Sequence, residues 1–297
     1  MIISLDNVNE ALISELKDFY RCYYSEKNRF FTDGYLSWLL LKNPHGEGIS
    51  VNIRLDCNIV ANMFLIPVKL IKKGESKLAY YVVDVLSHPN HRDKNLFVKM
   101  IRRAIEMTKE KGLCLIGHPN SNALPGWKRA KMSFQPNFVS YMSRPGICWK
   151  KKIVSSSKQI SKKDRMDLSL LIENNRTLII NADADFIIWK YINCPSKKYK
   201  VELLYKGSNI IGVIVSYKVQ RIVDRVVHYM YDDKYTREVI CSSVIPKIYS
   251  FPATSNLYGT YKLFFKHPLG TSVNYFFTDY SPDADNGSGI TYAACDN

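Results

Sequence analysis

Hydrophobic and polar positions follow their most informative pattern between residues 80 and 134. A run over residues 80–86 that is apolar except for Asp84 predicts a buried strand, and Pro89 predicts the turn that ends it. A helix is expected to begin near Leu96, and the apolar run over residues 113–117 predicts a second strand. The stretch therefore predicts a strand, a basic turn, a helix, a second strand and a second helix.

The basic turn meets the N-terminus of the first of these helices. Free backbone N–H groups and the helix dipole attract anions at such an end. His91, Arg92 and Lys94 add positive charge beside it. A diphosphate suits this arrangement, and solvated surface charges are the alternative interpretation of the same residues.

Residues 92–97 read Arg-Asp-Lys-Asn-Leu-Phe, between the predicted strand and the predicted helix. In order and spacing this region resembles the GNAT acyltransferase superfamily, whose Gln/Arg-x-x-Gly-x-Gly/Ala signature grips the pyrophosphate of coenzyme A. Asn95 stands at the glycine position, Phe97 replaces the small residue, and Asp93 adds a carboxylate. Asparagine accepts a left-handed backbone more readily than other non-glycine residues, so the turn can be retained.

The resemblance implies an α/β (α+β) fold in which a mixed, mostly antiparallel twisted sheet is flanked by helices. It also implies acetyl-CoA or another acyl-CoA as co-substrate. The coenzyme A site that it implies comprises Val85, Leu86, Arg92, Asp93, Lys94, Asn95, Leu96, Phe97 and Asn120.

Asp84 is the first candidate for a general base, because GNAT enzymes often carry an acidic residue on this strand that removes a proton from the acceptor amine. Burial among valines would raise its pKa and suit it to that role. His88 and His118 are further candidates, since imidazole titrates near neutral pH. The alternative for Asp84 is a carboxylate satisfied by hydrogen bonds at the strand, and the alternative for His118 is a side chain that fills the groove. Residues 127–131 lack the tyrosine that many of these enzymes use to protonate the leaving thiolate, so solvent or a distant residue would supply that proton.

An internal repeat relates the two halves of the chain. Residues 35–44 resemble residues 186–195, and Trp38 and Trp189 within them are 151 positions apart (189 − 38). Other landmarks keep this offset, which indicates a duplication. Each copy predicts a short helix that ends before a proline, then a strand, a polar turn and another strand.

The polar, basic stretch at residues 155–163 is the expected junction between two domains. Residues 1–153 would form a GNAT-like domain with the acyl-CoA-binding turn, and residues 154–297 a degenerate second one. In the second copy, three strands are expected before a helix over residues 236–249, and no comparable basic turn precedes that helix. This pairing resembles the tandem GNAT folds of Fem-type aminoacyltransferases and of acyltransferases encoded with bacterial surface-polysaccharide genes.

Composition sets broader limits. The 297 residues, 46% of them hydrophobic, suffice for two domains. Seven cysteines without a Cys-x-x-Cys pair indicate neither a disulfide framework nor a zinc site, and no metal is expected. The N-terminus does not read as a signal peptide and no apolar run approaches about 18 residues, so we expect a cytoplasmic protein without a transmembrane segment. The formal net charge of +15 attracts anions without selecting among them.

These observations predict an acyl-CoA-dependent N-acyltransferase, preferentially an N-acetyltransferase, in which the acceptor amine attacks the thioester directly. The acceptor would bind between the two copies. The resemblance points to an amino sugar, linked to a nucleotide or a lipid, from a bacterial surface-polysaccharide pathway. Two alternatives stay open: a Fem-like aminoacyltransferase that uses aminoacyl-tRNA, and a non-catalytic GNAT-fold binding or scaffold protein. Specific nucleic-acid binding is not expected, because no motif beyond basicity supports it.

Overall fold

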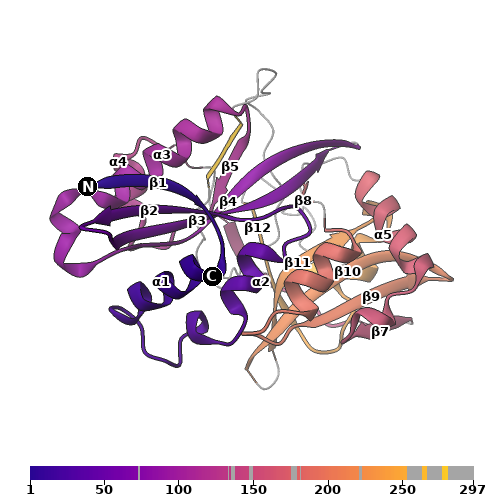
Figure 1. Cartoon of the computed structure of the whole chain (residues 1–297). Coiled ribbons are helices and arrows are strands. Elements are labelled where there is room, and N and C mark those ends of the chain that lie inside the picture. Colours follow the sequence, from indigo (N-terminus) through magenta and orange to yellow (C-terminus); the bar gives the residue numbers. More distant parts are fainter. Residues whose placement is uncertain are drawn as a thin grey trace.

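A computed structural model describes residues 1–72, 74–132, 134, 138–146, 150–174, 179–180, 182–220, 223–252, 263–265 and 276–279. Its elements form two mixed sheets, each flanked by helices (Figure 1). The mixed α/β class confirms the predicted fold class. Within the described parts of the chain, no helix is long and apolar enough to cross a membrane.

The first sheet has the strand order β1-β2-β3-β4-β5-β13, and β8 pairs with β3. Its strands are β1 (Ile2–Asn7), β2 (Ile49–Leu55), β3 (Asn58–Lys72), β4 (Glu75–Ser87), β5 (Cys114–Gly117), β8 (Ile179–Ile180) and β13 (Phe276–Asp279). β4 and β5 run parallel, and the other described pairs of this sheet are antiparallel. One face carries α1 (Glu10–Arg21) and α2 (Tyr35–Leu41), whereas α3 (Leu96–Glu110) and α4 (Leu124–Arg129) cover the other.

Local sequence explains why these helices lie where they do. The side chain of Asn9 accepts a hydrogen bond from the backbone N–H of Leu12 and so caps α1. Apolar residues at helical spacing give α1 and α3 one buried stripe each. The stripe of α3 includes Met100, Ile101 and Ala104, which pack into the core on the second face of the sheet.

The second sheet has the order β6-β12-β11-β10-β9-β7. Its strands are β6 (Phe138–Met142), β7 (Lys151–Val154), β9 (Lys200–Lys206), β10 (Asn209–Gln220), β11 (Val223–Tyr231) and β12 (Lys247–Pro252). The helices of this half are α5 (Lys162–Glu173), α6 (Ala184–Ile187), the π-helical turn η4 (Ile188–Ile192) and α7 (Thr236–Ile240). Short 3₁₀ turns are η1 (Arg29–Phe31), η2 (Pro89–Lys94), η3 (Ser157–Gln159) and η5 (Asp233–Tyr235).

The two sheets follow one topology. β2 to β5 correspond in order to β9 to β12, and in each set the last two strands are parallel. β9 begins 151 positions after β2 (200 − 49), and β10 begins 151 positions after β3 (209 − 58). The offset seen in the sequence therefore marks equivalent strands, which supports the proposed duplication.

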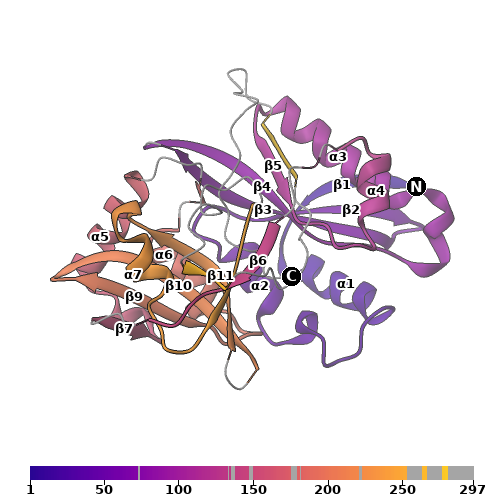
Figure 2. The same cartoon turned by 180° about the vertical axis from the view of Figure 1, so that it is seen from behind.

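Each sheet also contains a strand from the other half of the chain. β6 pairs antiparallel with β12 of the second sheet, and β13 pairs antiparallel with β5 of the first (Figure 2). Membership of the sheets consequently does not divide at residue 153, and the two-domain boundary stays a prediction.

The helix expected over residues 236–249 is too long. α7 ends at Ile240, and β12 begins at Lys247. Pro246 precedes that strand, and a proline disfavours helical backbone in the residue before it. Two elements therefore occupy the stretch assigned to one.

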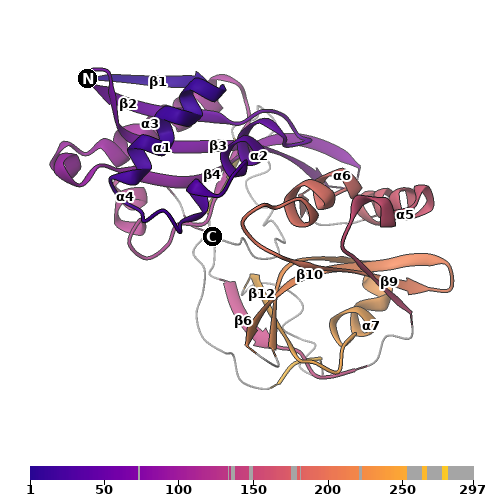
Figure 3. The same ribbon diagram turned by 60° about the horizontal axis from the view of Figure 1, so that its bottom comes forward.

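A shared hydrophobic core joins the halves. It contains Phe64 and Ile66 of β3 together with Val213 and Val215 of β10. Figure 3 shows α2 and α6 in the region between the two sheets. Trp189 is therefore buried between the two halves of the chain.

Trp38 and Trp189 meet between the halves in a reciprocal contact. Nε1 of Trp38 donates to the carbonyl of Trp189 at 2.8 Å, and Nε1 of Trp189 donates to the carbonyl of Trp38 at 2.9 Å. Their rings stack with centroids 5.3 Å apart. The two tryptophans that revealed the repeat thus contact one another across a local pseudo-twofold arrangement.

Candidate functional site

A bulge in β4 determines which way Asp84 faces. Asn62 pairs with Leu86 and Phe64 with Val83, so two residues of β4 oppose the single residue Met63. Asp84 takes a left-handed backbone with φ of 54°. Strict alternation would turn Asp84 toward α3, but the bulge turns it toward η1, where it contacts Arg29.

Asp84 and Arg29 form an ion pair at the bulge, with Nη2 of Arg29 2.5 Å from Oδ1 of Asp84. The Asp84 side chain is 11% exposed, and that of Arg29 is 37% exposed. Burial raises the pKa of Asp84, and the guanidinium partly offsets this rise. Burial lowers the pKa of Arg29, but the Asp84 carboxylate outweighs that effect, so the guanidinium stays charged.

Among the described strands, β5 pairs with only part of the β4 edge. The two strands pair from Ala79 with Cys114 to Val82 with Gly117, where β5 ends. β4 continues to Ser87, and no strand among the described residues pairs with this part of its edge. Backbone N–H and C=O groups there are placed to accept an extended ligand as an additional strand.

The turn at the end of β4 leads into the N-terminus of α3. Asn95 has φ of 53° and ψ of 32°, which confirms that it takes the left-handed position. Oδ1 of Asn95 accepts a hydrogen bond from Nη1 of Arg129 at 3.2 Å. Lys94 is exposed and Leu96 is buried, whereas the side chains of Arg92 and Asp93 lie outside the described residues. The helix end thus presents backbone donors beside Lys94 and Arg129.

Phe97 fits where the family has a small residue because Gly126 makes room for it. A Cβ on Gly126 would lie 2.4 Å from Cδ1 of Phe97. The ring also meets Trp127 edge-on, with centroids 6.0 Å apart. Phe97 therefore packs under α4, and its bulk is absorbed between the two helices.

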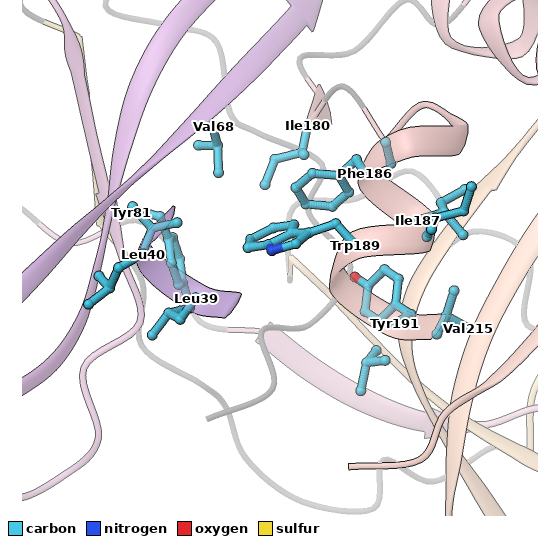
Figure 4. Close-up of a cluster of buried hydrophobic side chains, with 14 of the residues drawn as sticks. Leu39, Leu40, Val68, Tyr81, Ile180, Phe186, Ile187, Trp189, Tyr191 and Val215 are labelled. Atoms are coloured by element: carbon cyan, nitrogen blue, oxygen red, sulfur yellow. The ribbon is translucent and has the colours of Figure 1, made fainter. Parts of the chain in front are cut away.

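A cavity of about 200 Å³ lies between the halves and includes Asp84 in its wall. Its aromatic lining residues are Tyr35, Trp38, Tyr81, Phe186, Trp189 and Tyr199. Arg29, Lys190 and Lys197 contribute positive charge, and Asp84 is the carboxylate of the described lining. Figure 4 shows Phe186 and Trp189 projecting from their helix toward the side where Leu39 and Tyr81 lie.

The other predicted site residues lie in different surroundings. Nδ1 of buried His118 is 3.2 Å from the hydroxyl of Tyr81, and burial together with the charge of Lys190 lowers the pKa of His118 to about 3. Such an imidazole is neutral at pH 7 but a weak proton acceptor. Nδ1 of His88 accepts from the backbone N–H of Asn90 at 3.3 Å and caps η2. The geometry favours Asp84 over both histidines as a base.

The coenzyme A residues predicted outside the turn lie on both faces of the sheet. Val85 packs against the core under α3, and Leu86 faces the core under α1. Oδ1 of Asn120 accepts from the backbone N–H of Ala123 at 2.8 Å, so this side chain orders the entry to α4. The end of β4, the turn η2 and the end of β5 lie in one region of the first sheet, as their order along the chain predicts.

Residues 14–121 match the sequence profile of the acetyltransferase (GNAT) domain. This segment, residues 14–121, belongs to the GNAT superfamily. The match supports an acyltransferase and, in general terms, an acyl-CoA-dependent N-acetyltransferase. No curated protein sequence matches the chain.

Solved structures extend the likeness in fold over nearly the whole chain. A probable N-acyltransferase from Enterococcus faecalis V583 has 13% identity and a TM-score of 0.63, over 95% of this chain and 73% of that one. A GCN5-related N-acetyltransferase from Anabaena variabilis has 9% identity and a TM-score of 0.66, over 94% and 73%. The N-myristoyltransferase of Saccharomyces cerevisiae with bound myristoyl-CoA has 12% identity and a TM-score of 0.57, over 98% and 88%.

Several residues of this candidate site were not predicted from the sequence. Arg29 lies in the connection between α1 and α2, 55 positions before its partner Asp84. Lys190 and Lys197 come from the second half and line the cavity beside β4. In the sequence these residues are cations within aromatic-rich segments, which could have marked them as candidates. Nothing in the sequence predicts that they line the same cavity.

Proposed function

We propose that the protein transfers an acyl group from an acyl-CoA, preferentially acetyl-CoA, to an amine that occupies the cavity between its halves. Asp84 would remove a proton from the amine, and the amine would attack the thioester carbonyl directly. The carbon–nitrogen bond forms as the carbon–sulfur bond breaks, and coenzyme A leaves as the thiolate.

One observation carries the proposal: the edge of β4 is placed to bind the acyl-CoA, and Asp84 on the same strand is placed to contact the amine. No described strand pairs with the edge of β4 beyond Val82, and this edge leads to the cationic turn at the N-terminus of α3. The bulge turns Asp84 toward the cavity. Pantetheine would extend along this edge, with its diphosphate at the turn, so that the thioester and the amine meet at the bulge.

The cavity lining supports an acceptor with a ring. Aromatic faces stack well on sugar and aromatic rings, and six aromatic side chains line this cavity. An amino sugar is therefore the acceptor class that we would screen first. Carriage of that sugar by a nucleotide or lipid in a surface-polysaccharide pathway is the corresponding pathway proposal.

Thermal unfolding with acetyl-CoA and with free coenzyme A tests the cofactor half of the proposal. Ligand at about 100 times its Kd should stabilise the protein by about 2.7 kcal/mol, or about 5–10 °C. Arg92→Ala should reduce this shift. Arg102→Ala is the matched control, because Arg102 is an exposed cation on α3 outside the turn.

Absence of a shift with both ligands would overturn acyl-CoA use. A shift with aminoacyl-tRNA instead, lost steeply as salt rises, would establish the Fem-like alternative. Binding of acetyl-CoA without thiol release in the presence of any amine would support a non-catalytic protein.

A further inference from the structure

A buried network of polar side chains lies between α1 and the first sheet, behind the candidate site. The hydroxyl of Tyr20 donates a hydrogen bond to Oδ1 of Asn62. Nδ2 of Asn62 donates to Oδ1 of Asn52 at 2.8 Å and to Oγ of Ser50 at 2.9 Å. All four residues are 0% exposed. Buried polar groups cost free energy unless each finds a partner, so the network fixes its members in one arrangement.

The second copy of the fold is built without this network. Three of its polar residues correspond, at the offset of 151, to apolar residues of the second sheet: Ser50 to Val201 (201 − 50), Asn52 to Leu203 (203 − 52) and Asn62 to Val213 (213 − 62). The strand register agrees, because Asn52 pairs with Asn62 and Leu203 pairs with Val213. The three apolar residues are also 0% exposed. Apolar residues can therefore fill this layer, and packing alone does not explain the polar network of the first copy.

Tyr20 connects the network to the turn that carries Arg29. The ring of Tyr20 stacks on that of Phe30, with centroids 3.9 Å apart and an interplanar angle of 5°. Phe30 follows Arg29 in η1, and Cζ of Arg29 lies 5.6 Å from the centroid of the Phe30 ring. A residue anchored in the core thus supports the turn that presents the guanidinium to Asp84.

Asn62 connects the same network to the bulge of β4. It pairs with Leu86, and the next residue of β3, Met63, is the one that two residues of β4 oppose. The network therefore holds β3 at the point where β4 departs from regular pairing, next to Asp84. Tyr20 consequently contacts the elements that support both members of the Asp84–Arg29 pair.

Several titratable groups surround Asp84, and Arg29 is the one that pairs with it. Burial and, after it, the charge of Asp84 raise the pKa of Tyr20 well above its usual range, so its hydroxyl stays protonated as a donor. The same causes raise the pKa of Tyr24. The other titratable residues of the described cavity lining are Tyr35, Tyr81, Lys190, Cys194, Lys197 and Tyr199. Because Arg29 is in direct contact, a change in its position should have the largest effect on Asp84.

We propose that the buried network positions the Asp84–Arg29 pair for catalysis, with Tyr20 as the link between the network and the pair. The inference rests on the proposed acyl transfer. Tyr20, Ser50, Asn52 and Asn62 do not belong to the described cavity lining, so they would act through the pair as positioning residues. A displacement of about 1 Å in a reacting group can lower a rate by about 10²-fold, so support of this kind can matter to turnover.

A variant that carries the apolar residues of the second copy tests the proposal. It combines Tyr20→Phe with Ser50→Val, Asn52→Leu and Asn62→Val, so that donors and acceptors are removed together. Asp6 loses its bond from Asn52 but keeps its ion pair with Arg54 at 2.6 Å. The unfolding temperature and the affinity for coenzyme A should therefore stay close to those of the wild type. We expect kcat/KM for thiol release to fall at least about tenfold.

The pH profile separates positioning from a general loss of stability. Tyr20→Phe alone should loosen the contact between Arg29 and Asp84, and the acid limb of kcat/KM should move to higher pH. In an Arg29→Gln background the same substitution should cause no further shift. Gly212→Ala is the control, because it crowds Val239 in the second copy and should lower stability without moving the acid limb. NMR titration of the Asp84 carboxyl gives the same comparison without turnover.

An unchanged kcat/KM and acid limb in the four-residue variant would overturn the inference. If that variant does not fold, the inference is overturned by an Asp84 titration that Tyr20→Phe leaves unchanged, or shifts equally with and without Arg29. Absence of thiol release by the wild type would instead count against the proposed acyl transfer, and the NMR titration would still report on the pair.

Discussion

The two copies of the fold share one backbone contact and then diverge. At the end of β4 the N–H of His88 donates to the carbonyl of Val60 at 2.8 Å, and at the end of β11 the N–H of Asp232 donates to the carbonyl of Ile211 at 3.0 Å. In the first copy this contact leads to a cationic turn and the 15-residue helix α3. In the second it leads to an acidic turn and the five-residue helix α7.

Chemistry at the helix N-terminus explains why this difference matters. A diphosphate gains from both backbone donors and positive side chains, and a longer helix contributes more aligned dipoles. In the second copy, the side chain of Asp232 accepts a hydrogen bond from the backbone N–H of Lys234 at 3.0 Å, so this donor of the turn is already used. One topology can therefore yield an anion site or a structural support, depending on the turn after its fourth strand.

The largest expected effect tests whether the β4 bulge is catalytic. Asp84→Asn should lower kcat/KM by about 10²–10⁴-fold, because an amide cannot take the amine proton. Steady-state thiol release measures this, with coenzyme A binding followed in parallel. Asp33→Asn is the control, since Asp33 is an exposed carboxylate just after η1, the 3₁₀ turn that carries Arg29. Comparable activity in the two variants would remove Asp84 from the mechanism.

Loss of the partner of Asp84 should change both stability and pH dependence. Arg29→Gln leaves a buried carboxylate without its guanidinium, and we expect a loss of up to about 3 kcal/mol, reduced by the partial exposure of Arg29. Because burial already raises the pKa of Asp84, removal of Arg29 should raise it further.

The sign of the pH effect follows from proton binding. Folded Arg29→Gln would hold more protons on Asp84 than its unfolded chain does, so its stability should fall as pH rises through the folded pKa. Below the unfolded aspartate pKa, near 4, the loss should largely disappear. Denaturant unfolding at several pH values measures this, and the acid limb of kcat/KM should move to higher pH. A pH-independent loss would contradict the ion-pair explanation.

Two glycines allow the copies to be perturbed in parallel. Gly126→Ala would force a Cβ against Phe97 at 2.4 Å, and Gly212→Ala would force one against Cγ2 of Val239 at 2.7 Å. Each should destabilise the protein by about 1–3 kcal/mol. Gly126→Ala alone should also weaken coenzyme A binding, and Phe97→Ala should relieve its strain. Equal binding losses in both variants would indicate that the second copy takes part in the cofactor site.

The smallest expected effect on stability concerns the reciprocal contact between Trp38 and Trp189. Trp38→Phe and Trp189→Phe each remove one of the reciprocal hydrogen bonds, so each should cost about 1 kcal/mol. Thermal unfolding of the single and double variants measures their coupling. Strongly unequal single effects would argue against the pseudo-twofold description.

Local sequence patterns predicted the features that depend on interactions between residues close in the sequence. The strand, turn and helix around Asn95 were predicted because β-rich runs, prolines and helical spacing act over a few residues. The repeat was visible because equivalent strands kept a constant offset. The direction of Asp84 was not predictable, since a bulge inverts alternation without changing residue type. Its pairing with Arg29 and the exchange of β6 and β13 depend on long-range topology.

Because β6 and β13 each pair with a strand from the other half of the chain, the order of synthesis affects when the first sheet can be completed. β5 leaves the ribosome with the first half of the chain, but its antiparallel neighbour β13 is made after β12. Domains generally fold as their residues emerge, and here the first sheet must wait for a strand from the second half. The pairing of β5 with β13 therefore forms only after translation has passed Asp279.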